Sequence, residues 1–280
     1  MEKVKILNNI KYNVCGLAVL LGLASTAVLA HDPVFGIGPH VLFKDGFEVA
    51  LGVESEKAAD EKEQALQLEV TYGITGDWAI GVDLPYDYKD DGTNSSNGMG
   101  DLSVFSKYRF WRKDSLGLQE SAAVLVKVIT DTASTSKTPF LGKGTTDTIL
   151  GLTYGYEGRR WYRWAGARYR FNGKNNAGVD RGDKILLDFV GGIRPTPTGY
   201  LEPDTVWLLE LNGEYGKKAS FNGSNLANTG GTEWFISPGI FWTKRNFAIK
   251  AGVQIPVSSN LNGSQNESDY RAKLIFEWHL

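Results

Sequence analysis

Cysteine is almost absent from this 280-residue chain: it occurs once, as Cys15. That residue precedes an apolar run in an N-terminal segment that we expect to be removed, and it lacks the small-residue context of a lipidation site. The mature chain would then contain no cysteine. Disulfides and thiolate metal sites are therefore excluded as sources of stability or chemistry.

Long apolar runs are also missing once the first 30 residues have passed. No later stretch has the roughly 20 apolar residues that a membrane-spanning helix needs. Only helices and closed barrels satisfy their backbone polar groups in lipid, so any membrane role would have to come from strands. The mature sequence shows period-two alternation and no convincing helical periodicity.

The sequence has no excess of positive charge. Its formal net charge is −2, and loss of residues 1–30 removes three Lys and one Glu, which gives about −4 by the same counting. A mildly acidic chain argues against nucleic acid as a partner. The remaining length of about 250 residues suits one barrel, or one or two ordinary domains.

The N-terminus has the pattern of a secretory signal. Lys3, Lys5 and Lys11 form a basic region before the uncharged residues 12–30, which end in the small-apolar Val-Leu-Ala. We expect 1–30 to be a signal peptide cleaved before His31, with export to the outer membrane of a Gram-negative bacterium. The alternative is an uncleaved single-span anchor. The small residues of the run, and the lack of basic residues after it, favour the signal peptide.

The last eleven residues alternate strictly. Even positions from Tyr270 to Leu280 are apolar or aromatic, whereas most odd positions, from Arg271 to His279, are polar or charged. Successive strand side chains point to opposite faces, so this strand would have one apolar face and one mostly charged face. A strand between lipid and water has this pattern.

Similar alternation predicts about twelve strands, an even number as in bacterial single-chain barrels. The expected ranges are 46–55, 64–74, 77–87, 101–111, 117–130, 146–157, 161–171, 184–195, 205–215, 231–243, 246–257 and 268–280. We therefore predict an all-β fold, a transmembrane antiparallel β-barrel over residues 46–280, with residues 31–45 as an N-terminal lead or plug. The final strand would close the barrel against 46–55.

The connections differ in length in a regular order. Short links, such as 75–77, 158–160 and 244–246, alternate with long segments rich in Gly, Asn, Ser, Thr and Asp. Such alternation places all long loops at one end, as in barrels with short periplasmic turns and long extracellular loops. An all-β periplasmic domain is the competing fold, but it gives no reason for this segregation.

Aromatic residues recur near the short links. Their recurrence at one end is typical of the aromatic girdle of a membrane barrel, although cross-strand packing in hairpins would place some of them there too. The residues are Trp78, Phe110, Trp111, Tyr156, Trp161, Trp207, Trp242, Phe247 and Trp278. Arg163 is an exception to the parity, because it falls on the predicted lipid face.

Several spans resemble a known family. The segment Gly100–Phe110, with the sequence GDLSVFSKYRF, is similar to a strand of the outer-membrane barrel family named for the meta-pathway of phenol degradation. Residues 142–171 and 237–280 are similar as well. The resemblance implies an outer-membrane channel or transporter for small solutes, aromatic or apolar compounds among them. It assigns no transport residue.

The inward face of the predicted strands carries many charges, which are the candidate residues for filtering solutes. The basic set is Lys107, Arg109, Lys127, Arg168, Arg170, Arg194, Lys250, Arg271 and Lys273. The acidic set is Glu48, Glu54, Glu69, Asp83, Asp188, Glu210, Glu214 and Glu277. Opposed arcs of charge would create a transverse field across the lumen. The alternative is a salt-bridged interior that fills a narrow barrel.

The start of the mature chain contains two histidines. Cleavage before His31 would place a free amine beside an imidazole, and His40 could complete a copper-type chelate. The competing interpretation of this Gly- and Pro-rich segment is a lead that plugs or seals the periplasmic mouth. Apart from that metal we expect no cofactor.

Two other functions remain open beside a channel. Outer-membrane phospholipases use barrels of this size with a histidine base, but here the mature histidines, at 31, 40 and 279, do not lie in mid-strand beside a usable serine. We therefore do not expect an enzyme. A structural or adhesive barrel would use its long loops as contact surfaces. The expected partners are outer-membrane lipid and a small solute, and both a single barrel and a homo-oligomer fit the sequence.

Overall fold

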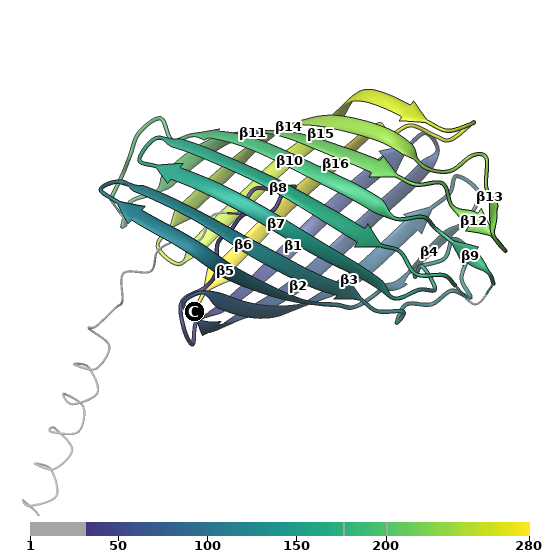
Figure 1. Cartoon of the computed structure of the whole chain (residues 1–280), viewed down its shortest axis with the longest axis horizontal. Helices are drawn as coiled ribbons and strands as arrows, with labels where there is room; N and C mark the ends of the chain where they lie inside the picture. Colours follow the sequence, from purple (N-terminus) through teal and green to yellow (C-terminus); the bar gives the residue numbers. More distant parts are fainter. Residues whose placement is uncertain (1–31, 176, 200) are drawn as a thin grey trace, which may run out of the picture.

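The computed structural model describes residues 32–175, 177–199 and 201–280 (Figure 1). The expected signal peptide at 1–30, with Cys15, lies outside the described residues, as does His31. None of the described residues is helical. Accordingly, this part of the chain contains no helix long and apolar enough to cross a membrane.

Within the described residues, twelve long strands form one closed antiparallel barrel. They are β1 (Phe47–Ala58), β2 (Glu61–Thr75), β3 (Trp78–Asp90), β5 (Ser103–Ser115), β6 (Leu118–Ile129), β7 (Asp147–Gly158), β8 (Trp161–Phe171), β10 (Lys184–Ile193), β11 (Asp204–Gly216), β14 (Gly231–Lys244), β15 (Phe247–Leu261) and β16 (Tyr270–His279). Each strand expected from the alternation is present, and the predicted all-β barrel is confirmed.

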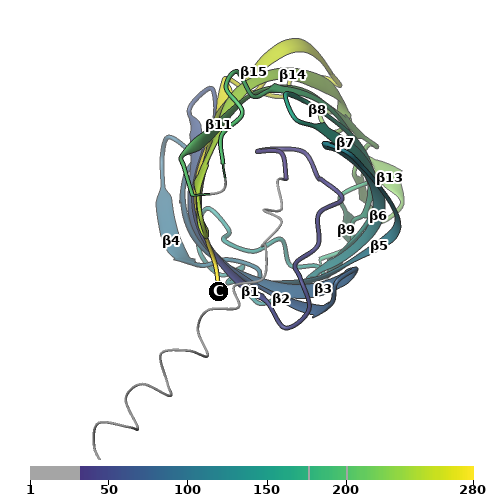
Figure 2. The ribbon, with the colours of Figure 1, turned by 90° about the vertical axis from the view of Figure 1, so that its left-hand side faces the viewer.

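The final strand closes the barrel, as expected. β16 pairs with β1 in a register that runs from Glu48↔His279 to Lys57↔Tyr270, and β1 in turn pairs with β2. β2 also pairs with β3, so the sheet returns on itself. Figure 2 shows the resulting ring end-on. Closure leaves no long barrel strand with an unpaired edge.

Four short strands were not expected, and all of them lie in the long loops. β4 (Ser95–Met99) extends the sheet beyond the barrel by pairing with the end of β3. β9 (Val179–Asp180), β12 (Ser220–Phe221) and β13 (Ser224–Asn225) form a separate three-stranded sheet. These segments of two to five residues are too short to show period-two alternation.

The two ends of the barrel differ. Two-residue turns join β2 to β3, β5 to β6, β7 to β8 and β14 to β15, at the left in Figure 1, where the C-terminus also lies. The short strands and most of the long loops lie at the other end, whereas the long connection between β10 and β11 lies at the turn end. One tight turn interrupts that pattern, because β1 meets β2 at the long-loop end through Ala59 and Asp60, with Ala59 at a φ of 51°. We call the two ends the turn end and the loop end.

The outer face is apolar. Val53, Trp207 and Leu274 are 45%, 54% and 38% exposed, although they stand in the middle of the sheet. Near the turn end, Phe247 stacks with Phe276 and contacts Trp278. The parity exception, Arg163, lies two residues from the start of β8, and its guanidinium covers the Tyr156 ring at 5.4 Å. An arginine at that depth can extend to the membrane interface.

The described part of the N-terminal lead, residues 32–45, runs inside the barrel and is drawn in purple in Figure 2. Val34 and Phe35 of the lead are buried in a cluster of inward apolar side chains. The barrel members of this cluster are Tyr162, Trp164, Val190, Val206, Leu208, Phe241 and Ala248. The sequence did not reveal this apolar interior patch, because stretches such as 206–209 of β11 are apolar on both faces and show no alternation.

Candidate functional site

The lead is fixed by one carboxylate on the barrel wall. Glu210 of β11 accepts hydrogen bonds from the backbone N–H groups of Val34 at 2.7 Å, Phe35 at 3.3 Å and Gly36 at 2.9 Å. Glu210 is only 1% exposed. The three N–H donors replace the water that the buried carboxylate loses. Because the acceptor is a carboxylate, each of the three hydrogen bonds is charge-assisted.

Further contacts attach the rest of the lead to other strands. Lys107 of β5 holds Asp32 at 2.6 Å, and the Thr153 hydroxyl of β7 donates to the carbonyl of Ile37 at 2.9 Å. His40 is buried, with its Nε2 against the Glu157 carboxylate at the end of β7. The lead therefore crosses the lumen and leaves it at the turn end, where β1 begins.

Glycines on the barrel wall give the lead its space. A Cβ at Gly155 would come within 2.8 Å of the Pro39 ring, and one at Gly166 within 2.9 Å of the Ile37 side chain. At Gly73 the same atom would come within 2.0 Å of the Phe43 carbonyl oxygen. The lead thus packs closely against β2, β7 and β8, at positions where the wall has no side chain.

The nine basic residues predicted to line the lumen are all buried or half-buried, and each has a carboxylate partner. The pairs are Lys107 with Asp32 at 2.6 Å, Arg109 with Asp77 at 2.8 Å, Lys127 with Asp83 at 3.2 Å, Arg168 with Asp188 at 2.7 Å, Arg170 with Asp147 at 2.5 Å, Arg194 with Asp204 at 2.8 Å, Lys250 with Glu277 at 2.5 Å, Arg271 with Glu214, and Lys273 with Glu54 at 2.6 Å. Pairing at these distances neutralises much of the transverse field that opposed arcs would create.

The remaining predicted acidic residues are held in other ways. Glu48 lies 3.3 Å from His279 across the β1–β16 seam, and Glu69 accepts a hydrogen bond from the Thr71 hydroxyl at 3.2 Å. Glu210 binds the lead, as described above. The structure thus places all seventeen predicted charged residues in the interior or at its turn-end rim, mostly as paired groups.

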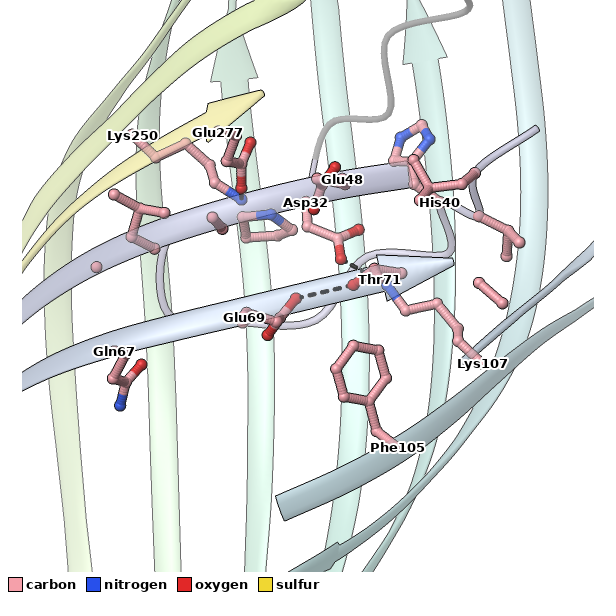
Figure 3. A pocket seen from close by; sticks show the side chains of 18 residues that line it. Asp32, His40, Glu48, Gln67, Glu69, Thr71, Phe105, Lys107, Lys250 and Glu277 are labelled. Atoms are coloured by element: carbon pink, nitrogen blue, oxygen red, sulfur yellow. Dashed lines mark hydrogen bonds and ion pairs between the residues drawn. The ribbon is translucent and has the colours of Figure 1, made fainter. Parts of the chain in front are cut away.

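An inner cavity of about 190 Å³ lies between the lead and the wall formed by β1, β2, β5, β15 and β16 (Figure 3). Asp32 and His40 of the lead line it on one side. The labelled wall residues are Glu48, Gln67, Glu69, Thr71, Phe105, Lys107, Lys250 and Glu277. Charged and apolar side chains both line this cavity, and the lead forms part of its boundary.

A second cavity, of about 350 Å³, lies toward the loop end, and Gln67 lines both cavities. Acidic residues of β1, β2 and β3 line it, together with basic residues from β3, β6, β8 and the loop after β6. The charged members are Glu54, Glu56, Glu63, Asp83, Asp87, Asp101, Lys89, Lys127, Lys143 and Arg170.

Two charged residues of this cavity, Asp87 and Lys143, were not among the residues predicted to line the lumen. Asp87 shares the strand parity of Asp83, four residues earlier, so its inward direction could have been inferred. Lys143 lies in a long loop, where no periodicity indicates which way a side chain points.

A third cavity, of about 500 Å³, opens at the turn end. Glu157 and Tyr162 line it, among charged turn residues that include Arg159 and Arg194. Because His40 lines the inner cavity and Glu157 the turn-end cavity, the contact between them lies where the two cavities are separated.

One group of potential metal ligands occurs among the described residues: Glu48, Glu277 and His279, whose ligand atoms lie within 4.8 Å of one another. His40 is not part of it. The Lys250 ammonium lies 2.5 Å from Glu277, so a cation already neutralises this group. The metal candidates expected from the sequence are His31 and His40 instead; His31 lies outside the described residues.

A closed twelve-strand barrel with an apolar outer face and a charged interior has the fold of outer-membrane channels and porins. The crystal structure of an outer membrane channel from Pseudomonas putida F1 superposes with a TM-score of 0.67, at 11% identity, covering 89% of this chain and all of that one. A NanC porin structure gives a TM-score of 0.52 at 12% identity, covering 83% of this chain and all of the porin.

A family model described as "Putative MetA-pathway of phenol degradation" matches residues 30–243, so the chain belongs to this family. This confirms the family that the sequence motifs indicated. A search of curated proteins found no match.

Proposed function

We propose that this protein is an outer-membrane channel for small solutes, whose lumen is closed toward the turn end by the N-terminal lead, residues 31–45. The proposal includes export by the signal peptide at 1–30 and insertion in the outer membrane of a Gram-negative bacterium. The apolar outer face would contact lipid, with long loops outside the cell and tight turns in the periplasm.

One observation carries the proposal: cavities follow one another along the lumen and are interrupted by the lead. The loop-end and inner cavities share Gln67, whereas His40 and Glu157 lie between the inner and turn-end cavities. A purely structural barrel needs no such series of polar spaces. Movement of the lead would join them into a continuous path.

The aromatic or apolar solute that the family resemblance implied stays a proposal. The description of the family supports it, as do Phe105 and Ile275 at the inner cavity. The copper-type chelate receives no support from His40, which is engaged with Glu157. A transport role also accords with the solved neighbours, a channel and a porin, better than catalysis does.

Planar-bilayer conductance and liposome swelling test the proposal. The reconstituted barrel should carry current and admit sugars, amino acids and aromatic acids at rates that fall with size. A variant that lacks residues 32–42 should conduct more than the wild type, because nothing would then separate the cavities. A barrel that passes neither ions nor solutes in both forms would refute the channel and leave the structural or adhesive role.

A further inference from the structure

Two charged side chains that line the loop-end cavity have no partner. Within the described residues, every other charged group of this cavity forms an ion pair or accepts hydrogen bonds: Glu63 pairs with Lys89 at 3.4 Å, for example, and Arg170 with Asp147. Asp87 forms no ion pair and no side-chain hydrogen bond, and the same is true of the Lys143 ammonium. One cavity thus presents an unpaired anion and an unpaired cation.

A third group on the same wall is only half satisfied. Asp83 is 8% exposed, and its Oδ2 contacts Lys127 and the Ser103 hydroxyl. Its Oδ1 is buried and has no hydrogen-bond partner. Asp83 and Asp87 have the same parity on β3 and both line the cavity, so this wall carries two carboxylates, of which Asp87 is unpaired and Asp83 has one buried oxygen without a partner.

The position of Lys143 is fixed by its backbone. The N–H of Lys143 donates to Asp101 Oδ2 at 3.0 Å, and Asp101 Oδ1 accepts from Ala133 N–H at 2.9 Å. The loop after β6 is thereby tied to the start of β5. The Lys143 amine lies near Arg170, whose guanidinium is already engaged by Asp147. Burial and the neighbouring Arg170 and Arg181 lower the pKa of Lys143 to about 7, so a ligand carboxylate in this cavity would favour its ammonium form.

We propose that the loop-end cavity is a binding site for a small zwitterion, with the ligand's ammonium against Asp87 and Asp83 and its carboxylate against Lys143. The inference rests on the proposed channel function and names a substrate class for it. A zwitterion satisfies both unpaired charges at once, whereas a singly charged solute leaves one of them unsatisfied. The volume of about 350 Å³ falls at the lower end of the ~300–1,000 Å³ range of small-molecule sites.

Four solutes with the same carbon skeleton test the two halves of the site. They are 4-aminobutyrate, butyrate, butylammonium and 1-butanol, titrated calorimetrically into the detergent-solubilised, full-length mature barrel. Wild-type protein should bind 4-aminobutyrate about tenfold tighter than either singly charged analogue, since each charge-assisted contact contributes on that order. It should bind 1-butanol least.

Variants assign the two ends. Asp87→Asn should weaken 4-aminobutyrate about tenfold and leave butyrate unchanged, whereas Lys143→Gln should weaken 4-aminobutyrate and butyrate but not butylammonium. Asp131→Asn and Lys174→Gln make the same charge changes on exposed residues outside the cavity and should change nothing. Equal binding of all four solutes, or losses that do not follow this crossed pattern, would overturn the zwitterion site.

Swelling assays separate this outcome from failure of the channel itself. If liposomes that contain the wild-type protein admit the four solutes at equal rates, and calorimetry detects no binding of 4-aminobutyrate, the channel function is supported and the zwitterion site is wrong. If no solute enters and no current flows, the proposed channel function fails, while calorimetry still decides the site.

Discussion

The Glu210 carboxylate on β11 accepts a hydrogen bond of 2.7 Å from the backbone N–H of Val34, a residue 176 positions earlier in the chain. The bond joins the lead to the wall at a buried point, and two further N–H groups share the same carboxylate. This contact holds the lead in the lumen, whereas the charges of the opposed arcs are largely neutralised by pairing.

Replacing this anchor should open the lumen. Glu210→Ala leaves three buried N–H donors without an acceptor, at a cost on the order of 1–3 kcal/mol for each group, so the lead should detach. We expect a higher single-channel conductance in planar bilayers. Glu210→Gln retains one carbonyl acceptor and should have a smaller effect. Glu120→Gln, whose carboxylate accepts from Tyr154 away from the lead, serves as the control; a change equal to that of Glu210→Ala would contradict the anchor.

The close approach of lead and wall gives an independent test. Gly155→Val places side-chain atoms where the Pro39 ring lies, 2.8 Å from even the first added carbon, so the lead should be displaced. Conductance should rise while the barrel remains folded on a heat-modifiability gel. The matched control is Gly191→Val, because an added Cβ there has nothing within 4 Å. Unchanged conductance in both variants would mean that the lead does not obstruct the path.

The barrel itself could be predicted from the sequence because its determinants are local and repeat. Alternation of apolar and polar residues indicates the two faces of each strand, and short links indicate the tight turns. The inward direction of Glu210, Lys273 and Glu277 followed from parity alone. The four short loop strands could not be found, since two to five residues are too few to show a period.

The partners of the inward residues could not be predicted, because pairing depends on three-dimensional register. Parity says that Lys107 points inward, but only the fold brings it to Asp32 of the lead. Lys143 could not be predicted because it lies in a loop, whereas the inward direction of Asp87 on β3 could have been inferred from the parity of Asp83. The apolar patch around Val34 and Phe35 was hidden by strands that are apolar on both faces.

The closing seam should depend on one ion pair more than on its neighbours. Lys273 of β16 lies 2.6 Å from Glu54 of β1, and both side chains are mostly buried. A double-mutant cycle with Lys273→Met and Glu54→Gln should give a coupling energy of about 1–3 kcal/mol, measured by urea unfolding in detergent. The exposed pair Lys57–Asp269, at 3.3 Å, is the control and should couple by less than about 1 kcal/mol. Equal coupling in the two cycles would show that burial does not strengthen the seam.

The order of the loops at the loop end should depend on Asp147. This carboxylate, 1% exposed, receives Arg170 of β8 at 2.5 Å and Arg181 of the loop before β10 at 2.6 Å, and it accepts the Gly173 N–H at 3.0 Å. Asp147→Asn removes the charge that both guanidinium groups share, and a cation left in a partly buried position is costly. We expect faster proteolysis within 131–146 and 172–183 in intact outer membranes, read by mass spectrometry of the released peptides. Asp183→Asn, whose partner Lys217 is exposed, should leave the rate of cleavage nearly unchanged, since an exposed pair contributes little. If cleavage were equally slow in both variants, Asp147 would not be the residue that holds these loops over the cavity in which Lys143 lies.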